Sequence, residues 1–130
     1  MQAKPGDLSR EDDLAAKFGI KRFSADPKAD HLASLLVDHH MEPWPSDVRK
    51  GGRYGTIEAV LAQPDVFGWA LSAWRGSLSD TDRTRLAEYA NEIESSLGSF
   101  PPIGRKSFER LMLLARTAVE FRVRPRSTTK

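Results

Sequence analysis

Apolar residues recur at helical spacing along this sequence, between residues that typically start and stop helices. The clearest case begins at Ser79, has Asp80 and Asp82 in its first turn and ends at Gly98. Serine caps the free N–H groups of a helix start, carboxylates complement the helix dipole there, and glycine favours the left-handed turn that ends a helix. The sequence therefore predicts an amphipathic helix whose apolar stripe is Leu86, Tyr89, Ala90, Ile93 and Leu97.

Two further helices are predicted before this one by the same reasoning. Residues 9–18 combine a serine start, acidic residues in the first turn and an apolar edge that ends at Gly19. Asp26-Pro27 is a typical start, with aspartate as the cap and proline at the first helical position, and this helix is expected to reach about His40. Pro43 and Pro45 prevent it from continuing.

The middle of the chain predicts a loop followed by two short helices. Met41 to Gly55 is rich in proline and glycine and reads as a flexible loop. A short helix is expected over 56–62, with Ile57, Val60 and Leu61 pointing inward, and a second is expected to start at Pro64 and end at Gly76. Phe67, Ala70, Leu71 and Trp74 form the apolar stripe of this second helix.

The last predicted helix covers about Lys106 to Phe121, and its broad apolar face suggests a central position. Residues 119–124 also alternate between apolar and charged, which leaves a strand open as an alternative. We expect an all-α fold, an irregular bundle of four to five helices, with residues 1–122 as one domain and 123–130 as a basic, flexible tail.

Composition narrows the classes of function. Hydrophobic residues make up 39% and charged residues 29% of 130 residues, as in globular domains. Cysteine is absent, which excludes disulfides, cysteine-based zinc sites and thiol nucleophiles. No apolar run is long enough to cross a membrane and no secretory signal is evident, so we expect a cytoplasmic location, in the host cytoplasm for a protein of a virus or mobile element.

Catalytic and metal-binding chemistry receive little support from the residues. His31, Asp38, His39, His40 and Glu42 are the densest group of potential metal ligands, but neighbouring histidines on a helix point about 100° apart. No nucleophile elbow, zinc-protease motif or phosphate-binding loop is present. We therefore expect a protein that is not an enzyme and that needs no cofactor or metal.

Two basic segments are the main candidate binding sites. The 49–55 loop joins three cations to an aromatic residue on a glycine-rich backbone, and a second aromatic residue lies just upstream: Trp44, Arg49, Lys50, Arg53 and Tyr54. Cations with aromatic rings suit phosphates and stacked bases. Residues 99–130 carry eight bases and two acids, and the candidates there are Arg105, Lys106, Arg110, Arg116, Arg122, Arg124 and Arg126. A solvated loop with Trp44 in the core, and a solubilising tail, remain the simpler interpretations.

Trp69 is a third candidate because it lies off the apolar stripe of its helix, beside small residues. Such a residue can anchor a partner protein, or pack under the 41–55 loop, which we favour. Leu113 also lies on the charged side of its helix and would extend a patch with Trp69.

Two functions remain open, beside a weaker third, a hydrolase or metalloprotein built on residues 31–42. The first is a helical protein-interaction module, such as a regulator, adaptor or accessory factor, that binds a protein partner or forms homo-oligomers. The acidic 78–98 segment and the basic 99–130 segment would suit self-association. The alternative is binding of DNA or RNA through the phosphate contacts of the 49–55 loop and the 105–126 segment.

Overall fold

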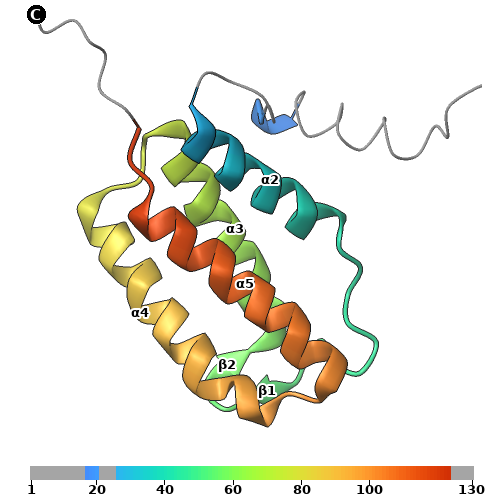
Figure 1. Cartoon of the computed structure of the whole chain (residues 1–130). Coiled ribbons are helices and arrows are strands. Elements are labelled where there is room, and N and C mark those ends of the chain that lie inside the picture. Colours follow the sequence, from blue (N-terminus) through green and yellow to red (C-terminus); the bar gives the residue numbers. More distant parts are fainter. Residues whose placement is uncertain (1–16, 21–25, 124–130) are drawn as a thin grey trace, which may run out of the picture.

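The computed structural model describes residues 17–20 and 26–123, and this part of the chain is an α-helical bundle with one short hairpin (Figure 1). Its elements in chain order are α2 (Pro27–Met41), β1 (Arg53–Tyr54), β2 (Ile57–Glu58), α3 (Ala59–Arg75), α4 (Asp80–Ser96), a 3-10 turn (Leu97–Ser99) and α5 (Pro102–Glu120). The predicted all-α fold is confirmed. The expected helix at 9–18 and the expected tail lie almost wholly outside the described residues.

The helix boundaries that depend on local capping lie where the sequence predicts them. The Asp26 carboxylate accepts a hydrogen bond from the Lys28 N–H at 3.0 Å, and Pro27 is the first residue of α2. The Ser79 hydroxyl likewise accepts from the N–H of Asp82 at 3.1 Å at the start of α4. Gly76 ends α3 in the left-handed conformation, with φ of 81°.

The prediction of two helices between 56 and 76 is wrong, because α3 runs unbroken through Pro64. The missing N–H of Pro64 removes one helical hydrogen bond, while a continuous buried stripe on α3 opposes a break: Ala59, Ala62, Val66, Ala70 and Ala73. Because these small residues face the core, Val60 and Leu61 point outward, with 46% and 50% of their surface exposed. Only Ile57 of the three residues expected to point inward is buried.

A hairpin replaces the end of the predicted 41–55 loop. Arg53 pairs with Glu58 and Tyr54 with Ile57 in antiparallel register. Gly55, at the turn, has φ of 62°, and a Cβ built there would collide with the Ser96 side chain of α4. Glycine is therefore required where the hairpin packs against the end of α4.

The last helix begins at Pro102 instead of Lys106 and ends at Glu120. Pro101 precedes the first turn of α5 and has no side chain that can accept hydrogen bonds from the free N–H groups of that turn. Asp47, in the segment after α2, supplies the acceptor. The Asp47 carboxylate accepts from the N–H groups of Ile103 and Gly104, each at 2.8 Å. The described residues after Glu120 form no strand, so the helix-end interpretation of this segment is confirmed as far as residue 123.

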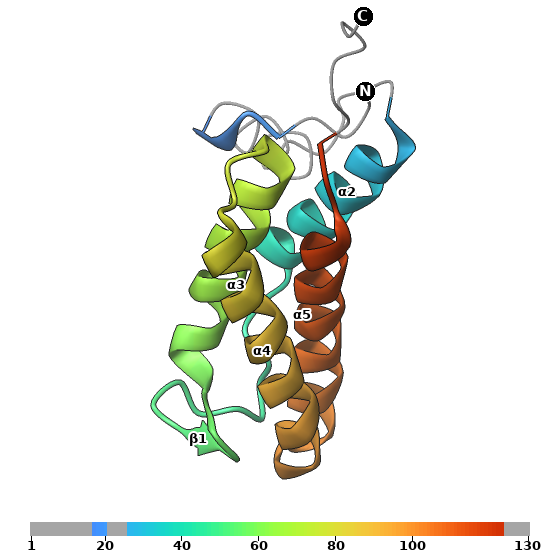
Figure 2. The same ribbon diagram turned by 90° about the vertical axis from the view of Figure 1, so that its left-hand side faces the viewer.

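The core lies around α5, as its broad apolar face predicts. In Figure 1 α5 lies in front of α3, with α2 on one side and α4 on the other, and Figure 2 shows the same packing from the side. Phe100 and Phe108 stack with ring centroids 4.3 Å apart, and Tyr54 stacks on Phe100 at 4.7 Å. None of the described helices is both long enough and apolar enough to span a bilayer.

Candidate functional site

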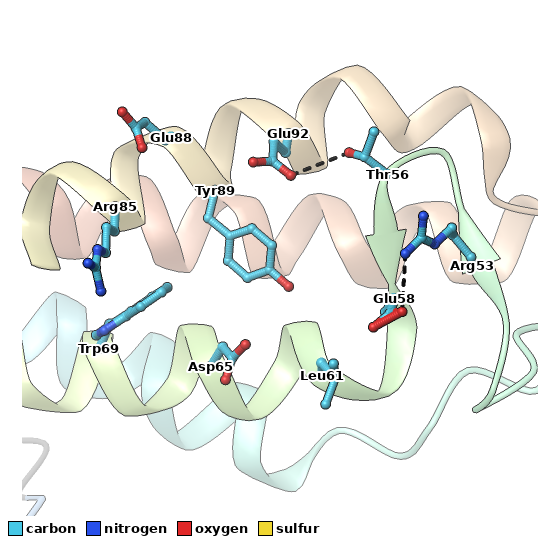
Figure 3. Close-up of a pocket in the computed structure, with 10 residues that line it drawn as sticks. All are labelled: Arg53, Thr56, Glu58, Leu61, Asp65, Trp69, Arg85, Glu88, Tyr89 and Glu92. Carbon is cyan, nitrogen blue, oxygen red and sulfur yellow. Dashed lines mark hydrogen bonds and ion pairs between the residues drawn. The ribbon is translucent and has the colours of Figure 1, made fainter.

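The surface between α3 and α4 is hollowed into an open groove of about 390 Å³ (Figure 3). One wall comes from α3, the other from α4, and the hairpin closes one end. The ten lining residues are Arg53, Thr56, Glu58, Leu61, Asp65, Trp69, Arg85, Glu88, Tyr89 and Glu92. We call this the α3–α4 groove.

Helical spacing explains how these side chains gather. Leu61, Asp65 and Trp69 follow one another at intervals of four residues, so they share one side of α3. Arg85, Glu88 and Glu92 recur at intervals of three and four on α4, with Tyr89 beside them. A second stripe therefore runs along each helix, on a different side from its core stripe.

The floor of the groove is aromatic. Trp69 and Tyr89, both partly buried, meet edge to face with ring centroids 6.1 Å apart. In Figure 3 the Tyr89 ring projects from α4 toward α3, and the exposed Leu61 side chain lies beyond it. This floor therefore presents a planar and aliphatic surface.

The rim of the groove is predominantly acidic. Four carboxylates, from Glu58, Asp65, Glu88 and Glu92, face two guanidinium groups, so the lining has a formal charge of minus two. Arg53 is already paired with Glu58 at 3.2 Å, and the Thr56 hydroxyl donates to Glu92 at 3.4 Å.

The pKa of Tyr89 reports the same electrostatic environment. Burial raises this pKa to about 12, and the nearby carboxylates of Asp65, Glu92 and Glu58 add to the rise. The Tyr89 hydroxyl therefore keeps its proton at neutral pH and remains a hydrogen-bond donor within an acidic groove.

Two predicted site residues, Arg53 and Trp69, line this groove. The ring partner of Trp69 is Tyr89 of α4, and not the 41–55 segment that we favoured. Leu113 does not extend a patch with Trp69: it borders a separate, small hollow between α2 and α5. The acidic residues of the groove were not among the predicted site residues, although their spacing on α3 and α4 was visible in the sequence.

The other loop candidates make contacts within the protein. The Trp44 indole donates to the carbonyl of Val48 at 2.6 Å, and the Lys50 ammonium lies 5.8 Å from the centre of the Trp44 ring. The Tyr54 hydroxyl accepts from the N–H of Arg49 at 3.0 Å. The 41–55 segment is thus held by hydrogen bonds, and the Tyr54 ring already stacks on Phe100.

Most of the C-terminal candidates also have partners within the chain. Arg105 donates to the carbonyls of Leu97 and Phe100, Arg110 makes two hydrogen bonds to Glu42, Arg116 pairs with Glu94, and Arg122 lies 3.8 Å from Asp80. Lys106 is exposed and forms no ion pair with any described residue. Arg124 and Arg126 lie outside the described residues.

The histidines near the end of α2 pack against aromatic rings. His39 stacks on Phe67 with ring centroids 5.7 Å apart, and His40 lies 6.0 Å from the Phe18 ring. Burial lowers the pKa of His39, which the nearby Glu42 only partly opposes. In the part of the chain that the structure describes, no three His, Asp or Glu side chains are grouped to hold a metal.

Among the described residues, acidic side chains separate the two basic segments, so the segments do not form one uninterrupted basic face. Glu42 and Asp47 hold the segment after α2 against the first half of α5, whereas Arg116 and Arg122 pair with residues of α4. The α3–α4 groove is therefore the best-defined candidate site. No protein-family model matches this sequence, and comparisons with curated proteins and with solved structures find no match.

Proposed function

We propose that this chain is a non-enzymatic protein-interaction module whose α3–α4 groove binds a basic, extended segment of another protein. The observation that carries the proposal is the combination of the Trp69–Tyr89 floor with four rim carboxylates. Aromatic rings are enriched at the energetic centres of protein interfaces, and opposite charge on the partner speeds and orients its docking.

The dimensions of the groove set the size of the segment. Leu61 and Trp69 are eight residues apart on α3, a rise of about 12 Å. An extended chain covers that distance with about four residues. Such a segment places a cationic side chain between Asp65 and Glu88 and an aliphatic group against Leu61. An arginine is the best fit, because it pairs with carboxylates and stacks on aromatic rings.

The alternative of DNA or RNA binding has less support. Arg53, Arg110 and Arg116 are already engaged by Glu58, Glu42 and Glu94, and phosphates would have to displace those carboxylates. The acidic α3–α4 groove repels a phosphate backbone. Exposed Arg49, Lys50 and Lys106 remain the residues that a nucleic acid would contact first.

A labelled peptide tests the proposal directly. Fluorescence anisotropy would measure binding of a nine-residue peptide of alternating arginine and leucine, with a glutamate–leucine peptide as the reference. We expect only the basic peptide to bind, more weakly at high salt because ionic strength screens charges. Glu88→Lys should weaken binding about tenfold, or about 1.4 kcal/mol. Glu109→Lys is the matched control, since Glu109 is an exposed α5 glutamate outside the groove.

Two outcomes would overturn the proposal. Equal loss of binding in the Glu88→Lys and Glu109→Lys variants would mean that the peptide follows overall charge and not the groove. Binding of a random DNA duplex at low salt that is abolished by Arg49→Glu and Lys50→Glu, without binding of the basic peptide, would favour the nucleic-acid function.

A further inference from the structure

One segment of this chain itself has the composition that the α3–α4 groove favours. Residues 124–130 read Arg-Pro-Arg-Ser-Thr-Thr-Lys, with three cations and no acidic residue. We infer that residues 124–130 bind the α3–α4 groove of their own molecule and compete there with the partner segment. This inference rests on the proposed function of the groove.

The described chain leads toward one end of that groove. A Cβ built on Gly76 would lie 2.8 Å from the Val123 side chain, and Arg122 lies 3.8 Å from Asp80. Gly76 ends α3 and Asp80 begins α4, so Val123 lies where the two walls of the groove are joined. Figure 1 shows the end of α5 beside this α3–α4 connection.

The seven residues after Val123 are long enough to follow the groove. Seven residues extend about 23 Å. Along α3, the rise from Gly76 back to Trp69 is about 10 Å and the rise to Leu61 is about 22 Å. A fully extended chain that starts at Val123 can therefore reach the level of Trp69 within three residues and the level of Leu61 within seven. Pro125 favours an extended backbone in the residue before it, which suits this path.

Charge and connectivity make this occupant effective. The end of the groove near Trp69 carries Arg85 as well as Glu88, whereas Asp65, Glu92 and Glu58 lie further along it. The attraction for the three cations of residues 124–130 therefore comes from four carboxylates against two guanidinium groups. A covalently tethered ligand is present at an effective concentration of about a millimolar. Even a weak contact between the groove and residues 124–130 is then populated in many molecules. The partner binds only the molecules whose groove is free, so its apparent affinity falls in proportion to the fraction of free grooves.

The experiment uses the full chain with Arg124→Glu and Arg126→Glu combined, and Arg49→Glu with Lys50→Glu as the charge-matched control. The first readout is the affinity for the arginine–leucine peptide. We expect the tail variant to bind about three- to tenfold more tightly than wild type, since removing a competitor restores the free groove. The control variant should bind as wild type does.

The second readout needs no peptide. In the ¹⁵N spectrum, the Trp69 indole resonance, assigned with Trp69→Phe, should move in the tail variant and not in the control variant. Its position in wild type should not depend on protein concentration, because the contact is intramolecular. A concentration-dependent position would assign the groove to a second copy and overturn the inference.

The two proposals fail in different ways. If the peptide binds wild type and the tail variant equally and the Trp69 indole resonance does not move, the inference is wrong and the proposed function stands. If no peptide binds either protein but the indole resonance moves in the tail variant, the contact of residues 124–130 stands. In that case the groove does not serve a partner segment of this kind, and the proposed function is wrong.

Discussion

Replacement of Gly55 by alanine tests the packing that closes one end of the α3–α4 groove. Gly55 has φ of 62°, a region that costs a residue with a Cβ about 1–2 kcal/mol. The new Cβ would also collide with the Ser96 side chain, and overpacking of this kind typically costs about 1–3 kcal/mol. We expect Gly55→Ala to lower the free energy of unfolding by about 3 kcal/mol.

Urea denaturation followed by circular dichroism measures this loss, and Gly51→Ala is the matched control. Nothing lies within 4 Å of a Cβ built on Gly51, and its φ is not positive. In a Ser96→Gly background most of the collision disappears, so Gly55→Ala should then cost only the backbone share of about 1–2 kcal/mol. The reasoning is refuted if Gly55→Ala costs no more than Gly51→Ala, or costs the same in both backgrounds.

Three other perturbations test contacts of α2 and of the segment that follows it. Asp47→Ala removes the acceptor for two N–H groups at the start of α5, and should cost about 2 kcal/mol in urea denaturation; the exposed Asp65→Ala should cost less than about 0.5 kcal/mol. The pKa of His39 is lowered in the folded protein, so below pH 6.5 the unfolded chain takes up a proton more readily and the stability of the fold should fall. Thermal melts of His39→Gln should lack that decline, and those of the control His31→Gln should keep it. Burial acts to raise the pKa of Glu42, but hydrogen bonds from Arg110 and Ser107 outweigh it and lower that pKa. The stability gap between wild type and Glu42→Gln, present above pH 4.5, should therefore close as pH falls through the lowered pKa; a gap that persists in strong acid would contradict this.

Helix boundaries were predictable where the signal is local. A cap, a proline and a glycine act on residues within one turn, so Asp26-Pro27, Ser79 and Gly76 lie where the sequence predicts. Pro64 was misleading because its effect depends on what surrounds it. The lost hydrogen bond and the clash of the proline ring with the preceding turn together cost about 3 kcal/mol. Burial of the residues on both sides of Pro64, such as Ala62 and Val66, offsets this cost.

The pairing of charges could not be predicted from spacing. Arg110 and Glu42 are 68 residues apart, and Arg116 and Glu94 are 22 apart. Each pair forms because α5 packs between α2 and α4, which is a property of the whole bundle. Within the described residues, Arg110 and Arg116 are therefore paired with carboxylates from other parts of the bundle, whereas Asp65 and Glu88 of the α3–α4 groove form no ion pair.

The groove itself follows from how α3 and α4 meet α5. Both helices bury small or aliphatic residues against α5, whereas their facing sides carry Asp65, Glu88 and Glu92. These carboxylates lose solvation and repel one another if the helices close, so the gap persists and the Trp69–Tyr89 contact bridges it. A cation that enters the gap lowers this repulsion and stacks on the bridging rings at the same time. The same residues that keep α3 and α4 apart are therefore those that would favour the proposed basic segment, and a substitution that neutralises them should tighten the bundle while it weakens the proposed binding.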